Sequence, residues 1–175
     1  MQLQAVTNYT QDRYSFLKNV EGEPADSAGR VYAYADSKGI ATVGIGINLR
    51  VHGNLVLQTL GLDIAGTVLT GAALTAENGY IVELQQAFNS SYAFGRDINN
   101  AARTTLNAIL ARRAQDSRYS TFPAFQLTTD FSFVTTTDSK AVFDTVMAGY
   151  PGFTGYETQL DNWLGIALGA GVVRP

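Results

Sequence analysis

One stretch near the N-terminus, residues 20–49, constrains the fold more than any other part of this 175-residue chain. It contains two runs rich in Tyr, Val and Ile, Val31–Asp36 and Ile40–Ile45, which predict two short strands. The residues between them are typical of a tight turn, in which Gly39 can adopt a positive φ. Gly44 and Gly46 follow in the returning run, and without side chains they let a substrate or another backbone come close. The stretch therefore predicts a β-hairpin that forms part of a site.

A carboxylate lies just before this hairpin, where a helical pattern stops. Thr10 can cap that helix, and its apolar stripe comprises Tyr14, Leu17 and Val20. Gly22 and Pro24 end the pattern, which places Glu21 at the C-terminal end of the helix. The helix dipole is negative there, and apolar neighbours would act in the same direction, so we expect the pKa of Glu21 to be raised. A carboxyl group that stays protonated near neutral pH is what a general acid requires.

A second carboxylate and a threonine complete an ordered set of polar residues. Asp36 lies at the hairpin turn, and Thr42 follows six residues later on the returning strand. The set resembles the phage lysozymes, the endolysin muramidases of glycoside hydrolase family 24, and their bacteriocin relatives such as pesticin. The matching residues are Glu21-Gly22, Tyr34-Ala35-Asp36, Gly39 and Thr42-Val43-Gly44-Ile45-Gly46. The resemblance covers about thirty residues and has two departures, an insertion at roughly Glu23–Gly29 and Ile47 in place of a common histidine.

This resemblance implies a lysozyme-like α+β fold in a single domain. A hairpin-containing lobe would span about residues 1–74 and a helical lobe about residues 75–175, with peptidoglycan bound in the cleft between them. The implied reaction is hydrolysis of the β-1,4 bond between N-acetylmuramic acid and N-acetylglucosamine. Glycosidases use two carboxyl groups for such a reaction. The resemblance also implies inversion at the anomeric carbon, with no metal or cofactor.

The same resemblance assigns roles to individual residues. Glu21 would be the general acid, and Asp36 together with Thr42 would hold the attacking water. The residues expected beside the substrate are Tyr34, Gly44 and Gly46. If the insertion has shifted the register, Glu23 or Asp26 would replace Glu21 as the acid.

The rest of the chain predicts helices and no repeat. The expected helix starts are Asn54, Thr75, Asp97 and Asp138, with a final apolar stripe of Tyr156, Leu160, Trp163 and Leu164. The stretch His52-Gly53-Asn54 predicts a turn, and His52 has no visible carboxylate partner. Arg112-Arg113 predicts a solvated helix end, with contact to the anionic wall as the alternative.

Composition excludes several other kinds of chemistry. The chain has no cysteine, which excludes disulfides, thiol catalysis and cysteine-bound zinc. A single histidine excludes His-x-x-x-His metal motifs and zinc amidases built on them. A net charge of −3 gives no basic stripe for nucleic acid. No signal peptide and no apolar run long enough for a membrane span is visible.

Two alternatives to a muramidase stay open at this stage, and a third possibility is that the muramidase is itself a toxin domain. A lytic transglycosylase cleaves the same bond and can work with one acidic residue. A non-catalytic wall-binding or structural module of a phage tail or secreted toxin would need neither carboxylate. A toxin domain cut from a larger protein would have an immunity or inhibitor protein as its partner, and whether the C-terminus is natural stays open too. For the muramidase we expect a monomer that reaches the periplasmic wall through a holin, a phage tail or a secretion carrier.

Overall fold

The computed structural model describes residues 9–159 and residue 162, and it confirms the α+β fold class. In chain order the elements are α1 (Tyr9–Glu21), β1 (Val31–Ala35), β2 (Ala41–Val43), β3 (Ile47–Asn48), α2 (Leu49–Thr59), α3 (Gly71–Asn89), α4 (Ala101–Ala114), the 3-10 turns η2 (Ser117–Tyr119) and η3 (Pro123–Gln126), β4 (Ser132–Phe133), α5 (Thr136–Ala148), β5 (Gly149–Tyr150) and β6 (Phe153–Thr154). None of the helices within these residues is both long enough and apolar enough to cross a membrane.

The predicted hairpin is present and forms the centre of an antiparallel sheet with strand order β3-β2-β1-β4. In its register Tyr34 lies opposite Thr42, and Thr42 lies opposite Asn48. Because directly opposed residues share one face of a sheet, these three side chains lie on the same face. The sheet is completed by β4, which comes from the C-terminal half of the chain and pairs with β1.

The opposite face of the sheet belongs to the hydrophobic core. Alternate residues of β1, namely Val31, Ala33 and Ala35, are fully buried in it, together with residues of helices α1 to α5. This core is continuous from Tyr14 in α1 to Val146 in α5. The division into lobes at about residue 74 stays a prediction.

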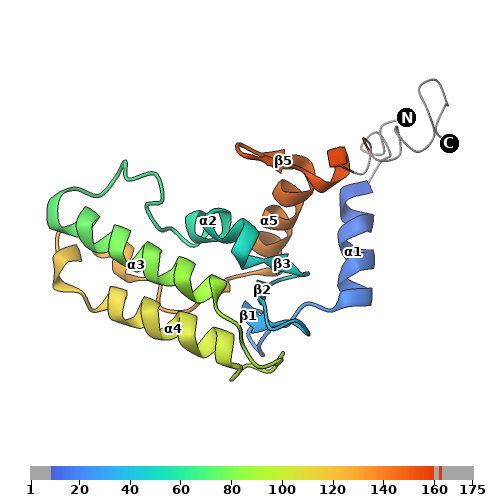
Figure 1. Ribbon diagram of the computed structural model, residues 1–175, viewed down its shortest axis with the longest axis horizontal. Coiled ribbons are helices and arrows are strands. Elements are labelled where there is room, and N and C mark those ends of the chain that lie inside the picture. Colours follow the sequence, from blue (N-terminus) through green and yellow to red (C-terminus); the bar gives the residue numbers. More distant parts are fainter. Residues whose placement is uncertain (1–8, 160–161, 163–175) are drawn as a thin grey trace.

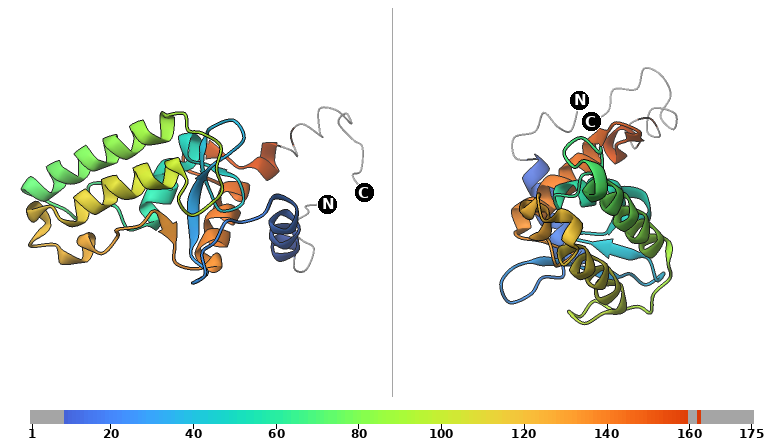
Figure 2. Two further views of the ribbon diagram at one scale, coloured as in Figure 1. Left: turned by 90° about the horizontal axis from the view of Figure 1, so that it is seen from below. Right: turned by 90° about the vertical axis from the view of Figure 1, so that its left-hand side faces the viewer.

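Figures 1 and 2 show how the helices are arranged around the sheet. The two long helices α3 and α4 run side by side on one side of the molecule, and α4 also packs against β1. Helices α1 and α5 lie on the other side and contact each other, while α2 links α3 to α5. The sheet therefore sits between two pairs of helices, with the hairpin close to the C-terminal end of α1.

The prediction of a turn at His52-Gly53-Asn54 is wrong. Helix α2 runs through these residues, and it begins because Asn48 caps it, with its side-chain oxygen accepting from the N–H of Arg50 at 2.9 Å. Glycine is tolerated in mid-helix here for a packing reason. A Cβ on Gly53 would lie 2.5 Å from the ring of Phe88 in α3.

The other predicted helix starts agree with the structure only in part. Helix α5 begins at Thr136 with a capping box formed by Thr135 and Asp138, and Val142, Phe143 and Val146 are buried as predicted. Helix α3 begins before Thr75, at Gly71, and α4 is capped by Asn100 and not by Asp97. Of the predicted final stripe, Leu160, Trp163 and Leu164 lie outside the described residues.

Arg113 corrects the prediction of a solvated helix end. It is 1 % exposed and makes two hydrogen bonds to the carboxylate of Glu77, at 2.7 and 2.9 Å. The hydroxyl of Tyr119 donates to the same carboxylate at 2.6 Å. Arg112 is exposed as predicted. The pair Glu77–Arg113 therefore joins α3 to α4 inside the protein, and Arg113 is not available to the cell wall.

Candidate active site

Glu21 is the last residue of α1, as predicted. The helix ends there because Gly22 takes a φ of 73° and Pro24 follows, while the N–H of Gly22 still donates to the carbonyl of Lys18 at 3.0 Å. Glu21 is exposed, so it is not buried among the apolar neighbours expected from the sequence. What remains of the expected environment is the negative end of the helix.

Asp36 directly follows β1 and organises the hairpin turn. Its Oδ1 accepts the backbone N–H groups of Lys38 and Ile40, both at 2.9 Å, and Gly39 has a φ of 74°. This is the ordinary structural role of an aspartate in a turn. Because the turn uses only Oδ1, the role does not occupy the second carboxylate oxygen.

Thr42 lies in the middle of β2 and is 2 % exposed. Its hydroxyl donates to the carbonyl of Ile40 at 3.0 Å. A hydroxyl has one donor and two acceptor lone pairs. The Thr42 hydroxyl therefore keeps its acceptor capacity.

Tyr34 is a buried residue of β1, two residues before Asp36. Burial raises the pKa of its hydroxyl, the Arg96 guanidinium and the Gly46 N–H oppose this rise, and the charges of Asp36 and Glu21 add to it. The contact of the end of α1 with this tyrosine runs through Arg96.

Arg96 is a residue of this site that the sequence did not indicate. Its guanidinium lies 4.7 Å from the centroid of the Tyr34 ring and donates to the carbonyl of Gly22 at 3.1 Å. The loop that carries it is fixed by two backbone hydrogen bonds between Gly95 and Ala35, at 3.0 and 3.2 Å. Arg96 therefore joins the residue after Glu21 to the hairpin. No local pattern predicts this, because the loop comes from beyond α3.

Glu23, one of the alternative acids, is enclosed by other side chains. It accepts hydrogen bonds from the hydroxyls of Tyr14, at 2.8 Å, and Ser139, and Lys18 lies 2.9 Å from its other oxygen. Its side chain is 0 % exposed. A substrate cannot reach a carboxylate in this position without rearrangement of α1 or α5.

Asp26, the second alternative, holds the inserted loop together. It accepts the N–H groups of Ala28 and Arg30 and pairs with the Arg30 guanidinium at 2.7 Å. The backbone hydrogen bond from Arg30 is the main cause that lowers the pKa of Asp26. A lowered pKa suits an ionised structural carboxylate and not a proton donor.

The two glycines expected beside the substrate have different surroundings. Gly44 is buried, and a Cβ there would lie 2.6 Å from Ser139 Oγ and 3.7 Å from Glu23 Oε1. Gly46 is exposed, with no atom within 4 Å of the position of its Cβ. The close approach at Gly44 is thus made by the protein itself, whereas Gly46 is open to a ligand.

Within the described part of the chain, no three His, Asp or Glu side chains are grouped so that they could hold a metal ion. The arrangement therefore offers acid–base chemistry from carboxyl groups, with tyrosine, threonine and arginine as supporting groups. Comparison of the chain with models of protein families, with curated proteins and with solved structures finds no match.

Proposed function

We propose that this protein is a peptidoglycan hydrolase, an N-acetylmuramidase that cleaves the β-1,4 bond between N-acetylmuramic acid and N-acetylglucosamine. One observation supports this most. Arg96 contacts the Tyr34 ring and donates to the carbonyl of Gly22, so the end of α1 that carries Glu21 lies beside the strand that leads to Asp36. Two carboxyl groups that flank the scissile bond are what glycoside hydrolysis needs.

In this mechanism Glu21 protonates the oxygen of the leaving sugar. Asp36, through the oxygen that the turn does not use, and the Thr42 hydroxyl hold the water that attacks the anomeric carbon, and Asp36 takes up the proton that this water loses. An attack by water from the opposite face inverts the anomeric configuration. No metal or cofactor takes part in these steps.

The exposed position of Glu21 suits a polymeric substrate that cannot enter a closed cavity. The protein would act as a monomer on the periplasmic wall, after release by a holin, a phage tail or a secretion carrier. An immunity or inhibitor protein would then bind over the same surface.

The test is digestion of purified peptidoglycan by Glu21→Gln, which keeps the shape of the side chain and removes its proton. General acid catalysis contributes about 10²–10⁴-fold, so the rate should fall by this factor. Asp12→Asn, an exposed carboxylate in the first turn of the same helix, should keep the wild-type rate. A wild-type rate in Glu21→Gln would refute the assignment of the acid.

Analysis of the products distinguishes this reaction from its nearest alternative. Hydrolysis leaves reducing muramic acid ends, whereas a lytic transglycosylase leaves anhydro ends, and mass spectrometry separates the two. In early NMR spectra the α-anomer should form first. A β-anomer would show that Asp36 does not act by directing water, and anhydro ends would show that no hydrolysis occurs.

A further inference from the structure

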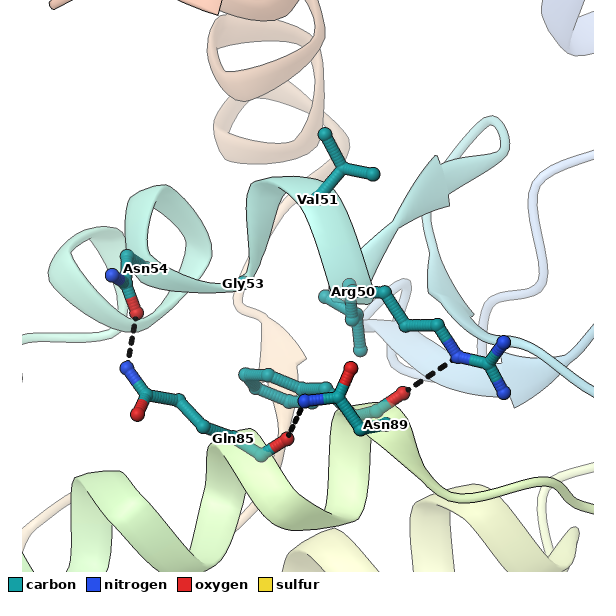
Figure 3. A pocket seen from close by; sticks show the side chains of 8 residues that line it. Arg50, Val51, Gly53, Asn54, Gln85 and Asn89 are labelled. Atoms are coloured by element: carbon teal, nitrogen blue, oxygen red, sulfur yellow. Dashed lines mark hydrogen bonds between the residues drawn. The ribbon is translucent and has the colours of Figure 1, made fainter. Parts of the chain in front are cut away.

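A pocket of about 230 Å³ lies between α2 and α3, and none of the candidate catalytic residues lines it. Figure 3 shows its walls. Its lining includes Arg50, Val51, Asn54, Gln85, Phe88 and Asn89. Pockets for drug-sized ligands measure roughly 300–1,000 Å³. This one is smaller and open, which suits one ring of a longer molecule.

Three side-chain amides define the chemistry of this pocket. Gln85 Nε2 donates to Asn54 Oδ1 at 2.9 Å, across the space between the helices, and Asn89 Nδ2 donates to the carbonyl of Gln85 at 2.9 Å. These bonds use one donor of Gln85, one acceptor of Asn54 and one donor of Asn89. Gln85 Oε1, Asn89 Oδ1 and Asn54 Nδ2 keep capacity for a ligand. The pocket thus offers acceptors and a donor side by side, without a net charge from the amides.

The one charged residue in the lining is already engaged. Arg50 donates through Nε to the carbonyl of Phe88 at 3.2 Å and through one terminal nitrogen to the carbonyl of Ser90 at 2.9 Å. Its guanidinium therefore satisfies the C-terminal end of α3. These bonds go with a side chain that extends away from Asn54 and Gln85 (Figure 3), and the amides carry no charge, so the pocket favours a neutral ligand.

Apolar groups complete the pocket. Val51 is 52 % exposed at its edge. The absence of a side chain at Gly53 lets the ring of Phe88 reach the backbone of α2, which closes the floor. An acetamido sugar carries a methyl group beside groups that both donate and accept hydrogen bonds. The hydroxyls and the N-acetyl group of N-acetylglucosamine therefore match the amide and apolar parts of this lining.

The pocket is also connected to the candidate active site. Asn48, which caps α2, lies opposite Thr42 in the sheet, and Arg50 is the second residue after it. The segment that leaves α3 at Asn89 continues to Tyr92, whose N–H donates to the carbonyl of Gly39 in the hairpin turn at 3.0 Å. From this we infer that the α2–α3 pocket is an outlying subsite for a neutral N-acetylglucosamine unit of the glycan strand. This inference rests on the proposed function for its substrate class.

The test uses the full-length Glu21→Gln protein, so that binding is measured without turnover. N-acetylglucosamine tetramer is added, and the side-chain NH₂ signals of Asn54, Gln85 and Asn89 are followed by NMR. These signals should shift, and cellotetraose, which lacks acetamido groups, should leave them unchanged. In Asn54→Ala/Gln85→Ala, affinity should fall by about tenfold. Asn78→Ala, an exposed amide of α3 outside the pocket, is the matched control.

Two results would overturn the inference. One is the absence of any shift of the three signals at millimolar tetramer, and the other is a response to both sugars alike. Digestion of peptidoglycan by the wild-type protein, together with no such shift in Glu21→Gln, would refute the subsite alone. Shifts in Glu21→Gln, together with a wild-type protein that digests no peptidoglycan, would refute the muramidase and keep the sugar site.

Discussion

At the scale of single residues, two neighbouring glutamates have opposite surroundings. Glu21 is exposed at the end of α1, whereas Glu23 is enclosed by Tyr14, Lys18 and Ser139. The sequence could not separate them, because Ser139 lies in α5, far along the chain. A carboxylate with such partners stabilises the fold, and one without them is free to react. The two substitutions to glutamine should therefore have different effects.

We predict that Glu23→Gln lowers the free energy of unfolding by about 1–3 kcal/mol. The substitution weakens two hydrogen bonds to a charged acceptor and an ion pair whose lysine is partly exposed, and hydrogen bonds to charged groups contribute about 1.5–3 kcal/mol each. Urea unfolding monitored by circular dichroism measures this loss. Glu21→Gln should stay within about 0.5 kcal/mol of the wild type, as exposed positions do. A stable but inactive Glu23→Gln, beside an active Glu21→Gln, would mean that Glu23 is the acid.

At the scale of elements, the turn between β2 and β3 contains two glycines with different constraints. Both have a positive φ, 60° at Gly44 and 72° at Gly46. Only Gly44 also faces another side chain at close range, Ser139 Oγ. The turn is therefore held against α5 at Gly44 and free at Gly46.

Alanine substitutions should separate these two constraints. Gly46→Ala should cost about 1–2 kcal/mol, the strain of a left-handed backbone at a residue with a Cβ. Gly44→Ala should cost more, because its Cβ would meet Ser139 Oγ at 2.6 Å in addition to the same strain. Thermal unfolding of both variants gives the comparison. In a Ser139→Gly background the difference should shrink, and equal losses in the wild-type background would show that Ser139 does not constrain the turn.

The elements also show where prediction from sequence succeeded. The hairpin was predictable because its strands, its turn and Gly39 are consecutive in the chain. The sequence predicts a turn in place of helix α2 because Gly53 is typical of a turn in its local context. In the structure this glycine leaves room for the ring of Phe88 in another helix. The set of Glu21, Asp36 and Thr42 could also be read from the sequence, because these residues lie close together in the chain. Arg96 could not be predicted, since only the folded chain brings its loop to Gly22 and Tyr34.

At the scale of the whole molecule, His52 in α2 contacts the segment that follows α5. Its Nδ1 lies 3.0 Å from the Tyr150 hydroxyl and its Nε2 lies 3.3 Å from the Tyr156 hydroxyl, while the ring of Phe153 packs on it edge-on. The imidazole is 1 % exposed, and no carboxylate contacts it within the described residues. Burial lowers the pKa of His52.

This single histidine gives the protein a dependence of stability on pH that can be assigned to one residue. Because the pKa of His52 is lower in the folded protein than in the unfolded chain, the unfolded chain takes up a proton first as the pH falls. Stability should therefore be constant above the unfolded pKa of about 6.5 and should decrease below it, until the pH reaches the folded pKa. Unfolding by urea at a series of pH values between about 7.5 and 5 measures this, above the range in which most carboxylates titrate. His52→Gln should be less stable at pH 7.5 but should lose the decrease between these pH values. An unchanged decrease in His52→Gln would assign it to another group and would leave His52 as a packing residue alone.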